Sequence, residues 1–343
     1  MNNYLDLRTG AGFVAALALV IGGVGACAMD GDDESYFAGQ LGGTSAAMAD
    51  LDCMVTLSRQ SFSDPDGRQS APCQGHIYQP NSAYSNNVLA SYLKTDTPNV
   101  VRVAFAFRGS ASVGDWIRNL QSQIELRRLN AVSEFPAREA QSGDYANARV
   151  GMGWDERWVN QAGLMLALLE RARADYPDRH LQIYLTGHSL GGVMATRAAL
   201  DVSVSAWQVD TTVRVYAWNP PRLGDDEAAK VMQAAIVPCL TEASECFEYR
   251  QFTRKRDVVH GLPANLSLDN IRDPWSHAVW QKKLKPTTGR PLKRDIGYCP
   301  HFHAPKVKGV GAHDLDIWRE QLADREVFTD EWLDCMLNPR PAS

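Results

Sequence analysis

The stretch that decides the fold is Thr186-Gly187-His188-Ser189-Leu190-Gly191-Gly192. An apolar run, residues 181–186, leads into it, and a helix rich in small residues is expected to follow it. Gly-x-Ser-x-Gly between a strand and a helix is typical of a sharp turn that projects a serine hydroxyl from the edge of a sheet. Glycine is needed on both sides of the serine, because larger side chains would clash in so tight a turn. The pattern therefore predicts that Ser189 is a nucleophile.

The helix expected after Ser189 supplies part of the chemistry. Its first backbone N–H groups have no partner inside the helix, and they point at the negative charge that develops on an attacked carbonyl. The N–H of Leu190 is therefore the expected first oxyanion donor.

The segments around this turn alternate between strand and helix patterns. Strands are predicted at 100–107, 181–186, 211–218 and 247–252, where β-branched and aromatic residues gather. Helices are predicted at 81–93, at 154–175, directly after Ser189 and at 225–236. This alternation indicates an α/β fold with a mostly parallel central sheet and helices on both faces.

Further motifs follow one another in a recognisable order. They are Phe107-Arg-Gly-Ser110 and residues 115–120, 217–224, 257–263, 275–280 and 313–318. With the Gly-His-Ser-Leu-Gly-Gly turn they resemble the fungal-type (class 3) lipases of the α/β-hydrolase superfamily over about residues 81–320. Asn219 stands where that family usually has glycine. The resemblance implies an α/β-hydrolase fold and a serine carboxylic-ester hydrolase acting on lipids, most simply an acylglycerol (triacylglycerol) lipase, with phospholipase A1 as the alternative.

The acid of the catalytic triad is expected after the nucleophile. A serine hydroxyl needs a histidine base, and the histidine needs a carboxylate that fixes its tautomer. In the α/β-hydrolase superfamily the chain order is Ser, acid, His. Asp257 follows a predicted strand and matches the family motif, although a surface aspartate paired with nearby cations would look the same. Asp225 and Asp226 are fallbacks that an N-cap would also explain.

The base must come from the histidines that follow Asp257. His260 is only three residues after the acid, and His277 matches the family's earlier, non-catalytic histidine. His313 precedes an apolar, aromatic-ended stretch, as the family's catalytic histidine does. We expect His313 to be the base, with His301 and His303 as alternatives.

The second oxyanion donor is expected in the loop after strand 100–107. By the resemblance this is Ser110, with Asp115 holding it in orientation. Residues 121–150 have no clear strand pattern, and residues 121–129 are expected to form a short amphipathic helix. The resemblance implies that residues 121–150 hold a lid over the acyl pocket, and a plain surface insertion is the alternative.

The N-terminal 26 residues look like a signal peptide. No charged residue lies between Thr9 and Met29, and small residues lead into Cys27 as in a bacterial lipobox. This implies cleavage before Cys27 and lipidation of its thiol, with plain secretion or an uncleaved anchor as alternatives. We expect residues 27–52 to be a flexible tether and residues 53–343 a single lipase domain.

The cysteines agree with export. There are seven, so lipidation of Cys27 leaves an even number that can form disulfides in an oxidising compartment. Pairing nearest neighbours gives 53–73, 239–246 and 299–335. If residues 1–26 are not a signal peptide, the alternative is that these six cysteines are reduced thiols.

Composition excludes several classes of function. The chain has 343 residues and is 45% hydrophobic, as in an ordinary globular protein. Its formal net charge of −5 gives no overall attraction for phosphate backbones, so nucleic-acid binding is not expected.

No metal or cofactor is expected. Cys299, His301 and His303 lie close together in the sequence, but the other ligands that a metal site would need do not appear in a matching motif. The expected partner is a lipid ester at a membrane or lipid–water interface. Peptidase or thioesterase chemistry on the same triad, and a non-catalytic envelope protein on this scaffold, remain alternatives.

Overall fold

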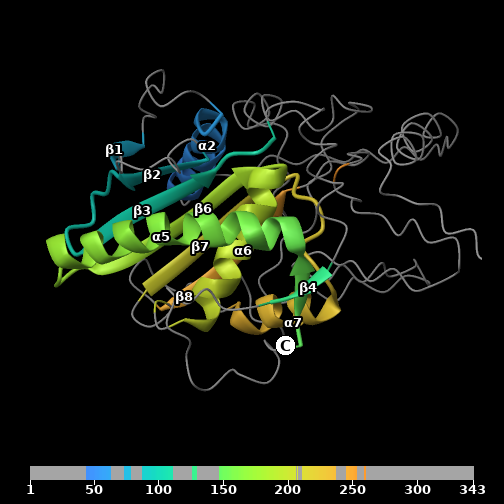
Figure 1. The fold of residues 1–343 in the computed structure, drawn as a ribbon. Helices are drawn as coiled ribbons and strands as arrows, with labels where there is room; N and C mark the ends of the chain where they lie inside the picture. Colours follow the sequence, from blue (N-terminus) through green and yellow to red (C-terminus); the bar gives the residue numbers. More distant parts are fainter. Residues whose placement is uncertain are drawn as a thin grey trace, which may run out of the picture. The chain divides into compact units, whose positions relative to one another are not determined.

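A six-stranded sheet is the centre of the described chain (Figure 1). The structure is a computed structural model that describes residues 44–62, 73–78, 87–110, 126–129, 147–205, 207, 211–236, 245–252 and 259. The strand order is β1-β2-β3-β6-β7-β8, antiparallel from β1 to β3 and parallel from β3 to β8. The strands are β1 (Gln74–Tyr78), β2 (Val88–Leu93), β3 (Val100–Phe107), β6 (His180–His188), β7 (Thr211–Trp218) and β8 (Cys246–Phe252).

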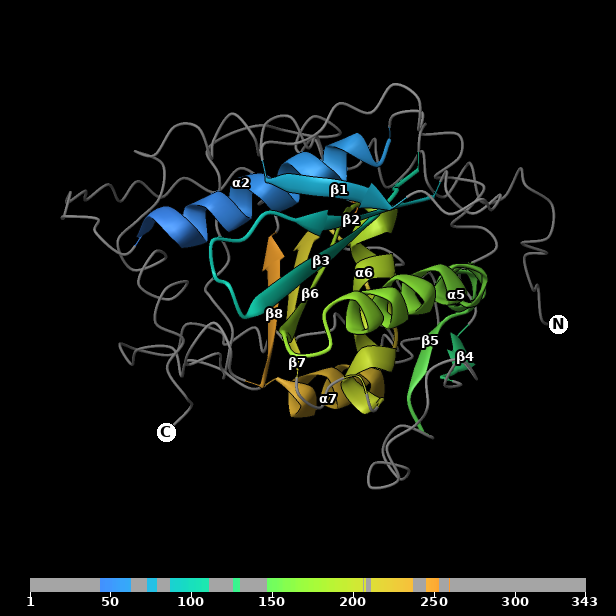
Figure 2. The ribbon, with the colours of Figure 1, turned by 90° about the vertical axis from the view of Figure 1, so that its left-hand side faces the viewer.

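Helices cover both faces of this sheet (Figure 2). Helix α2 (Thr44–Gln60) packs on β3, β6 and β7 from one side, and α6 (Leu190–Val204) packs on the same strands from the other. Helix α5 (Met152–Asp175) and helix α7 (Asp226–Ala235) lie against α6. A separate two-stranded sheet joins β4 (Leu126–Arg128) to β5 (Arg149–Gly151). The predicted α/β architecture with a mostly parallel, doubly covered sheet is confirmed.

Two predicted helices are wrong. Residues 88–93, predicted as the end of a helix over 81–93, form strand β2, which pairs residue for residue with β3. Five of its six residues are buried, so pairing with the sheet outweighs the local helix preference of its alanine and leucine residues. Residues 126–128, predicted as part of a helix over 121–129, form β4 and pair with β5.

The folded region begins earlier than the sequence indicates. Residues 44–52, assigned to the flexible tether, form the first half of α2. The remaining tether, the signal peptide and Cys27 lie outside the described residues, as does most of the lid candidate 121–150. Within the residues that the structure describes, no helix is long and apolar enough to cross a membrane.

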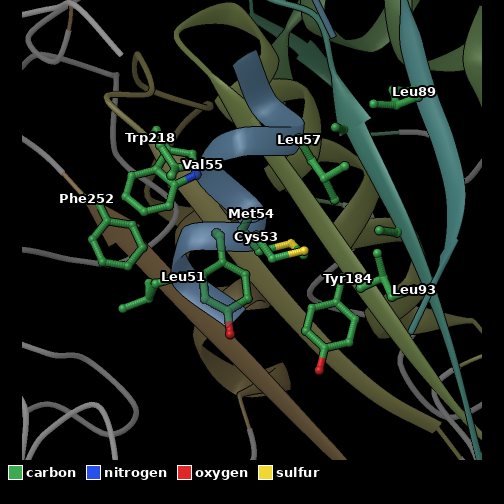
Figure 3. Close-up of a cluster of buried hydrophobic side chains, with 13 residues drawn as sticks. Leu51, Cys53, Met54, Val55, Leu57, Leu89, Leu93, Tyr184, Trp218 and Phe252 are labelled. Atoms are coloured by element: carbon green, nitrogen blue, oxygen red, sulfur yellow. The ribbon is translucent and has the colours of Figure 1, made fainter. Parts of the chain in front are cut away.

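Helix α2 is held by an apolar face that enters the core (Figure 3). Leu51, Met54, Val55 and Leu57 are at most 1% exposed. They pack on aromatic rings that the sheet directs toward α2, namely Tyr184, Tyr216, Trp218 and Phe252. The rings of Trp218 and Phe252 are stacked, with centroids 4.2 Å apart. Full burial of one such aliphatic side chain contributes about 2 kcal/mol, so α2 is an integral layer of the domain.

A disulfide joins α2 to the residue that precedes β1. Cys53 and Cys73 are bonded across 20 residues of chain, which confirms the predicted pair. Cys246 is also disulfide-bonded, and Cys239, Cys299 and Cys335 lie outside the described residues.

Removing the Cys53–Cys73 bond is expected to destabilise the domain. A double Cys53→Ser, Cys73→Ser variant should lose about 3 kcal/mol of unfolding free energy, because the unfolded chain regains the entropy of an open loop. Urea unfolding of both proteins under non-reducing conditions measures the difference. An unchanged midpoint and slope would show that the bond does not constrain the unfolded chain.

A buried ion cluster ties α5 to α6. Arg197, fully buried, donates hydrogen bonds of 3.0 and 2.8 Å from Nε and Nη2 to Asp155 Oδ1, and one of 2.8 Å from Nη1 to Asp201 Oδ1. The indole of Trp158 donates to the other oxygen of Asp201 at 2.5 Å. Half-exposed Arg127 of β4 lies 3.8 Å from Asp155 Oδ2. The two helices that cover this face of the sheet are therefore held together by charge as well as by apolar contact.

Candidate active site

Ser189 occupies the turn between β6 and α6. Its backbone has φ 58° and ψ −124°, which matches the first central position of a type II′ turn, a position normally given to glycine. A non-glycine residue held there costs on the order of 1–3 kcal/mol, and such strain is characteristic of functional sites. The N–H of Ser189 donates to the carbonyl of Trp218 at 2.9 Å, which anchors the turn to β7.

The glycines around Ser189 are required by close backbone contacts. A Cβ atom on Gly187 would lie 2.2 Å from the carbonyl oxygen of Gly191. A Cβ atom on Gly191 would lie 2.0 Å from the carbonyl oxygen of Phe107, at the end of β3. The steric expectation from the sequence is therefore met, and the second contact also brings the start of α6 against β3.

The predicted oxyanion donors are carried by neighbouring elements. Phe107 is in register with Gly187, so the loop after β3 and the turn after β6 leave the sheet side by side. At Gly109 the backbone comes so close to the carbonyl of His188 that a Cβ atom there would lie 2.6 Å from the oxygen. Ser110 is the last described residue of this loop, and Leu190 is the buried first residue of α6.

Positive charge lies beside this loop. Arg157 of α5 donates a hydrogen bond of 3.2 Å to Asn87 Oδ1, and the N–H of Arg108 donates to the Asn87 carbonyl at 2.8 Å. The pKa of Arg157 is lowered by burial and then by the charge of Arg108, although an arginine remains protonated near neutral pH. Two arginines therefore lie close together at the start of the loop that leads to Ser110.

His188, inside the Gly-His-Ser turn, has packing contacts. It is 7% exposed, and its ring lies 6.3 Å, centroid to centroid, from that of Phe62, which follows α2.

The backbone conformation explains why asparagine can stand at position 219, where the resembled family usually has glycine. Asn219 follows β7 with φ 46°, in the left-handed region that glycine adopts freely and asparagine tolerates better than most residues. Its N–H donates to the carbonyl of Phe252 at 2.7 Å. Asparagine therefore preserves the conformation that the usual glycine would provide.

Asp225, a fallback for the catalytic acid, is engaged in holding the fold. One carboxylate oxygen accepts the N–H groups of Ala228 and Arg149, both at 3.0 Å, and the other accepts from Arg149 Nε at 2.8 Å. The side chain thus caps the start of α7 and fixes β5. These contacts account for its burial without a catalytic role.

The remaining predicted site residues lie outside the described residues. They are the acid Asp257, the base His313 with its alternatives His301 and His303, and the oxyanion support Asp115. Strand β8, which precedes Asp257, is two places from β6 in the sheet. Among the described residues, no group of three or more His, Cys, Asp or Glu side chains is arranged to hold a metal ion.

A buried cluster of hydroxyl groups beneath the turn was not predicted. Thr186, three residues before Ser189, has its Oγ1 2.8 Å from Ser58 Oγ of α2 and accepts the Trp218 indole N–H at 3.1 Å. Ser58 and Thr186 are separated by 128 residues, so no local pattern could have paired them.

The chain is similar to a family of known proteins. The family model described as Lipase (class 3) matches residues 104–266. The secreted mono- and diacylglycerol lipase 2 of Gibberella zeae is 31% identical over 226 residues, 63% of this chain and 51% of that protein. Phospholipase A1-IIalpha of Arabidopsis thaliana is 25% identical over 151 residues, 38% of this chain and 34% of that protein. The solved LIP2 lipase of Yarrowia lipolytica has a TM-score of 0.48 at 16% identity, over 68% of this chain and 77% of that one. The chain spans between about a third and two thirds of the length of the curated relatives it matches.

Proposed function

We propose that the chain is a serine carboxylic-ester hydrolase that acts on lipids, on the premise that residues 104–266 match the model of the class 3 lipase family. The observation that carries the proposal is the strained backbone of Ser189, held between a buried strand and the first turn of a helix. Without a reactive role for its hydroxyl, a serine at a glycine-type conformation would be a net cost to stability.

The proposed reaction proceeds through an acyl-enzyme. The Oγ of Ser189 attacks the ester carbonyl while His313 takes its proton, and Asp257 stabilises the resulting imidazolium. The N–H groups of Ser110 and Leu190 bind the oxyanion, with Asp115 supporting Ser110, and one such donor is worth about 10²–10³-fold in turnover. His313 then protonates the leaving alcohol. Water activated by the same histidine releases the fatty acid and restores Ser189.

The substrate that we favour is an acylglycerol, and phospholipase A1 activity is the second candidate. The name of the Gibberella zeae relative supports the first, and that of the Arabidopsis relative supports the second. The proposed encounter takes place at a membrane or lipid–water interface, with residues 121–150 as the candidate lid.

A direct comparison of lipid esters tests the choice. Fatty-acid release from triolein emulsions is expected to exceed release from phosphatidylcholine vesicles by about tenfold or more, a discrimination that pocket contacts commonly provide. Titration of the released acid at equal interfacial area measures both rates. Faster release from phosphatidylcholine would assign the chain to phospholipase A1 activity instead.

We also propose that the protein is exported and anchored through Cys27. The Cys53–Cys73 disulfide supports an oxidising compartment, where such bonds persist. Metabolic labelling with palmitate should mark the wild type and not Cys27→Ala, because a lipobox cysteine carries the lipid. Equal labelling of both proteins would contradict the anchor, and absence of label from the wild type would favour free secretion.

A further inference from the structure

We propose that the last turn of α2 positions the nucleophile, through a hydrogen bond between Ser58 and Thr186. The inference rests on the proposed function, since it assigns a role in the reaction to residues outside the triad. Ser58, Ser61 and Thr186 are all fully buried, so none of them touches substrate, and each acts through the backbone that it holds.

The hydroxyl of Thr186 is the centre of the arrangement. It lies 2.8 Å from Ser58 Oγ, and it is within donating distance of the Tyr216 carbonyl at 2.9 Å and the Met54 carbonyl at 3.3 Å. It accepts the indole N–H of Trp218 at 3.1 Å. A single hydroxyl thereby joins β6, β7 and α2, directly below the turn that carries Ser189.

Two assignments of the protons place a hydrogen bond between Ser58 and Thr186. In the first, Ser58 donates to Thr186, and Thr186 donates to the Tyr216 carbonyl. In the second, Thr186 donates to Ser58, and Ser58 donates to the Met54 carbonyl. In both, Thr186 accepts the Trp218 indole N–H. In both, loss of the Ser58 hydroxyl removes a bond from Thr186, and loss of the Thr186 hydroxyl leaves the buried indole N–H of Trp218 without this acceptor.

The two residues that follow α2, Ser61 and Phe62, reach the oxyanion loop. Ser61 Oγ donates to the Ser58 carbonyl at 2.7 Å and lies 3.4 Å from the Phe107 carbonyl, the last of β3. The ring of Phe62 faces Gly109, where an added Cβ would come within 2.8 Å of its Cζ atom. The end of α2 and the two residues after it therefore contact both the strand that leads to Ser189 and the loop that leads to Ser110.

Trp218 completes the connection to the nucleophile. Its indole binds Thr186, and its backbone carbonyl accepts the N–H of Ser189. A shift of β6 against β7 would therefore move Ser189 relative to the oxyanion donors. Misplacement by about 1 Å costs on the order of 10²-fold in rate, so a shift of a fraction of that distance is enough to be measured.

The test compares Ser58→Ala and Thr186→Val with the wild type on p-nitrophenyl butyrate. We expect kcat to fall about tenfold with KM changed less than about twofold, because geometry at the transition state is lost and ground-state binding is kept. The inhibition constant of an alkyl boronic acid, which forms a tetrahedral adduct on the serine, should rise by the same factor as kcat falls. Thr186→Ser keeps the hydroxyl and should retain most of the wild-type kcat.

Two matched variants separate positioning from general destabilisation. Ser203→Ala removes a buried helical hydroxyl that bonds its own helix, at the Leu200 carbonyl, and Thr211→Val removes a buried strand hydroxyl far from the turn. Both should leave kcat and the boronic acid constant unchanged at temperatures well below unfolding. If one primary variant does not fold, the other provides the comparison, because each removes the same Ser58–Thr186 hydrogen bond.

The outcomes are distinct for the two proposals. If the wild type is active, two results overturn the positioning role alone. One is an unchanged kcat in Ser58→Ala and Thr186→Val, and the other is a loss of kcat in the two control variants equal to that in these two. Failure of Thr186→Ser to retain activity does the same. An inactive, folded wild type overturns the proposed function, and the positioning role with it.

Discussion

Ser189→Ala is expected to lower kcat on a short-chain p-nitrophenyl ester by about 10⁶-fold, the loss typical for removal of a triad nucleophile. The physical reason is that no other described group occupies the strained turn between β6 and α6, and an alanine methyl group forms no acyl-enzyme. The variant should still hydrolyse the ester about 10³–10⁴-fold faster than the uncatalysed reaction in water, because the oxyanion donors still stabilise the transition state for direct attack by water. Steady-state rates under saturating ester measure the effect.

The first control for Ser189→Ala is a measurement of its thermal stability, which shows whether the variant is folded. Alanine at φ 58° carries the same backbone strain as serine, so the melting temperature should change by only a few degrees. Ser203→Ala, which removes a buried serine remote from the turn, should keep full activity. Equal low rates in wild type and Ser189→Ala would instead favour a non-catalytic protein on a hydrolase scaffold.

The second large effect concerns stability. Arg197→Met is expected to reduce the free energy of unfolding by about 3–5 kcal/mol, because it leaves two buried carboxylates, Asp155 and Asp201, without their shared cation. Methionine fills the space of the aliphatic part of arginine but not that of the guanidinium group, so a cavity adds to the cost of the unpaired carboxylates. Urea unfolding at neutral pH measures the difference in unfolding free energy between the variant and the wild type. Guanidinium chloride is less suitable, because its ions screen the charges under test.

Arg171→Met is the matched control. Arg171 and Asp175 form an ion pair of 2.6 Å on the exposed side of α5, four residues apart, and Arg171 is 64% exposed. Exposed pairs contribute about 0.2–1 kcal/mol, so this variant should lie within about 1 kcal/mol of wild type. Similar losses in both variants would mean that burial does not raise the cost of an unpaired carboxylate in this domain.

Local patterns were sufficient to predict the centre of the fold. Strands 100–107 and 211–218 contain runs of β-branched and aromatic residues that only a buried strand accommodates on both faces, and the structure places them at those bounds. The turn at Ser189 was predictable because part of its steric constraint is local. A Cβ atom on Gly187 would clash with Gly191, four residues later, whereas the constraint on Gly191 comes from Phe107 of β3. The positive φ of Ser189 follows from the local constraint.

Features that depend on distant residues were not predictable. Strand β2 has a helix-compatible sequence and becomes a strand because β3 offers a full partner. The contact of Ser58 with Thr186 spans 128 residues, and the one between Arg197 and Asp155 spans 42. Such pairs arise from the packing of whole elements, and no spacing rule along the chain signals them.

A fluorophosphonate probe followed by peptide mapping tests whether the hydroxyl of residue 189 is the activated nucleophile. We expect a single adduct on Ser189, with labelling lost in Ser189→Ala and blocked by prior incubation with the boronic acid. Folded protein that remains unlabelled, or that carries the adduct on another residue, would contradict this role of Ser189.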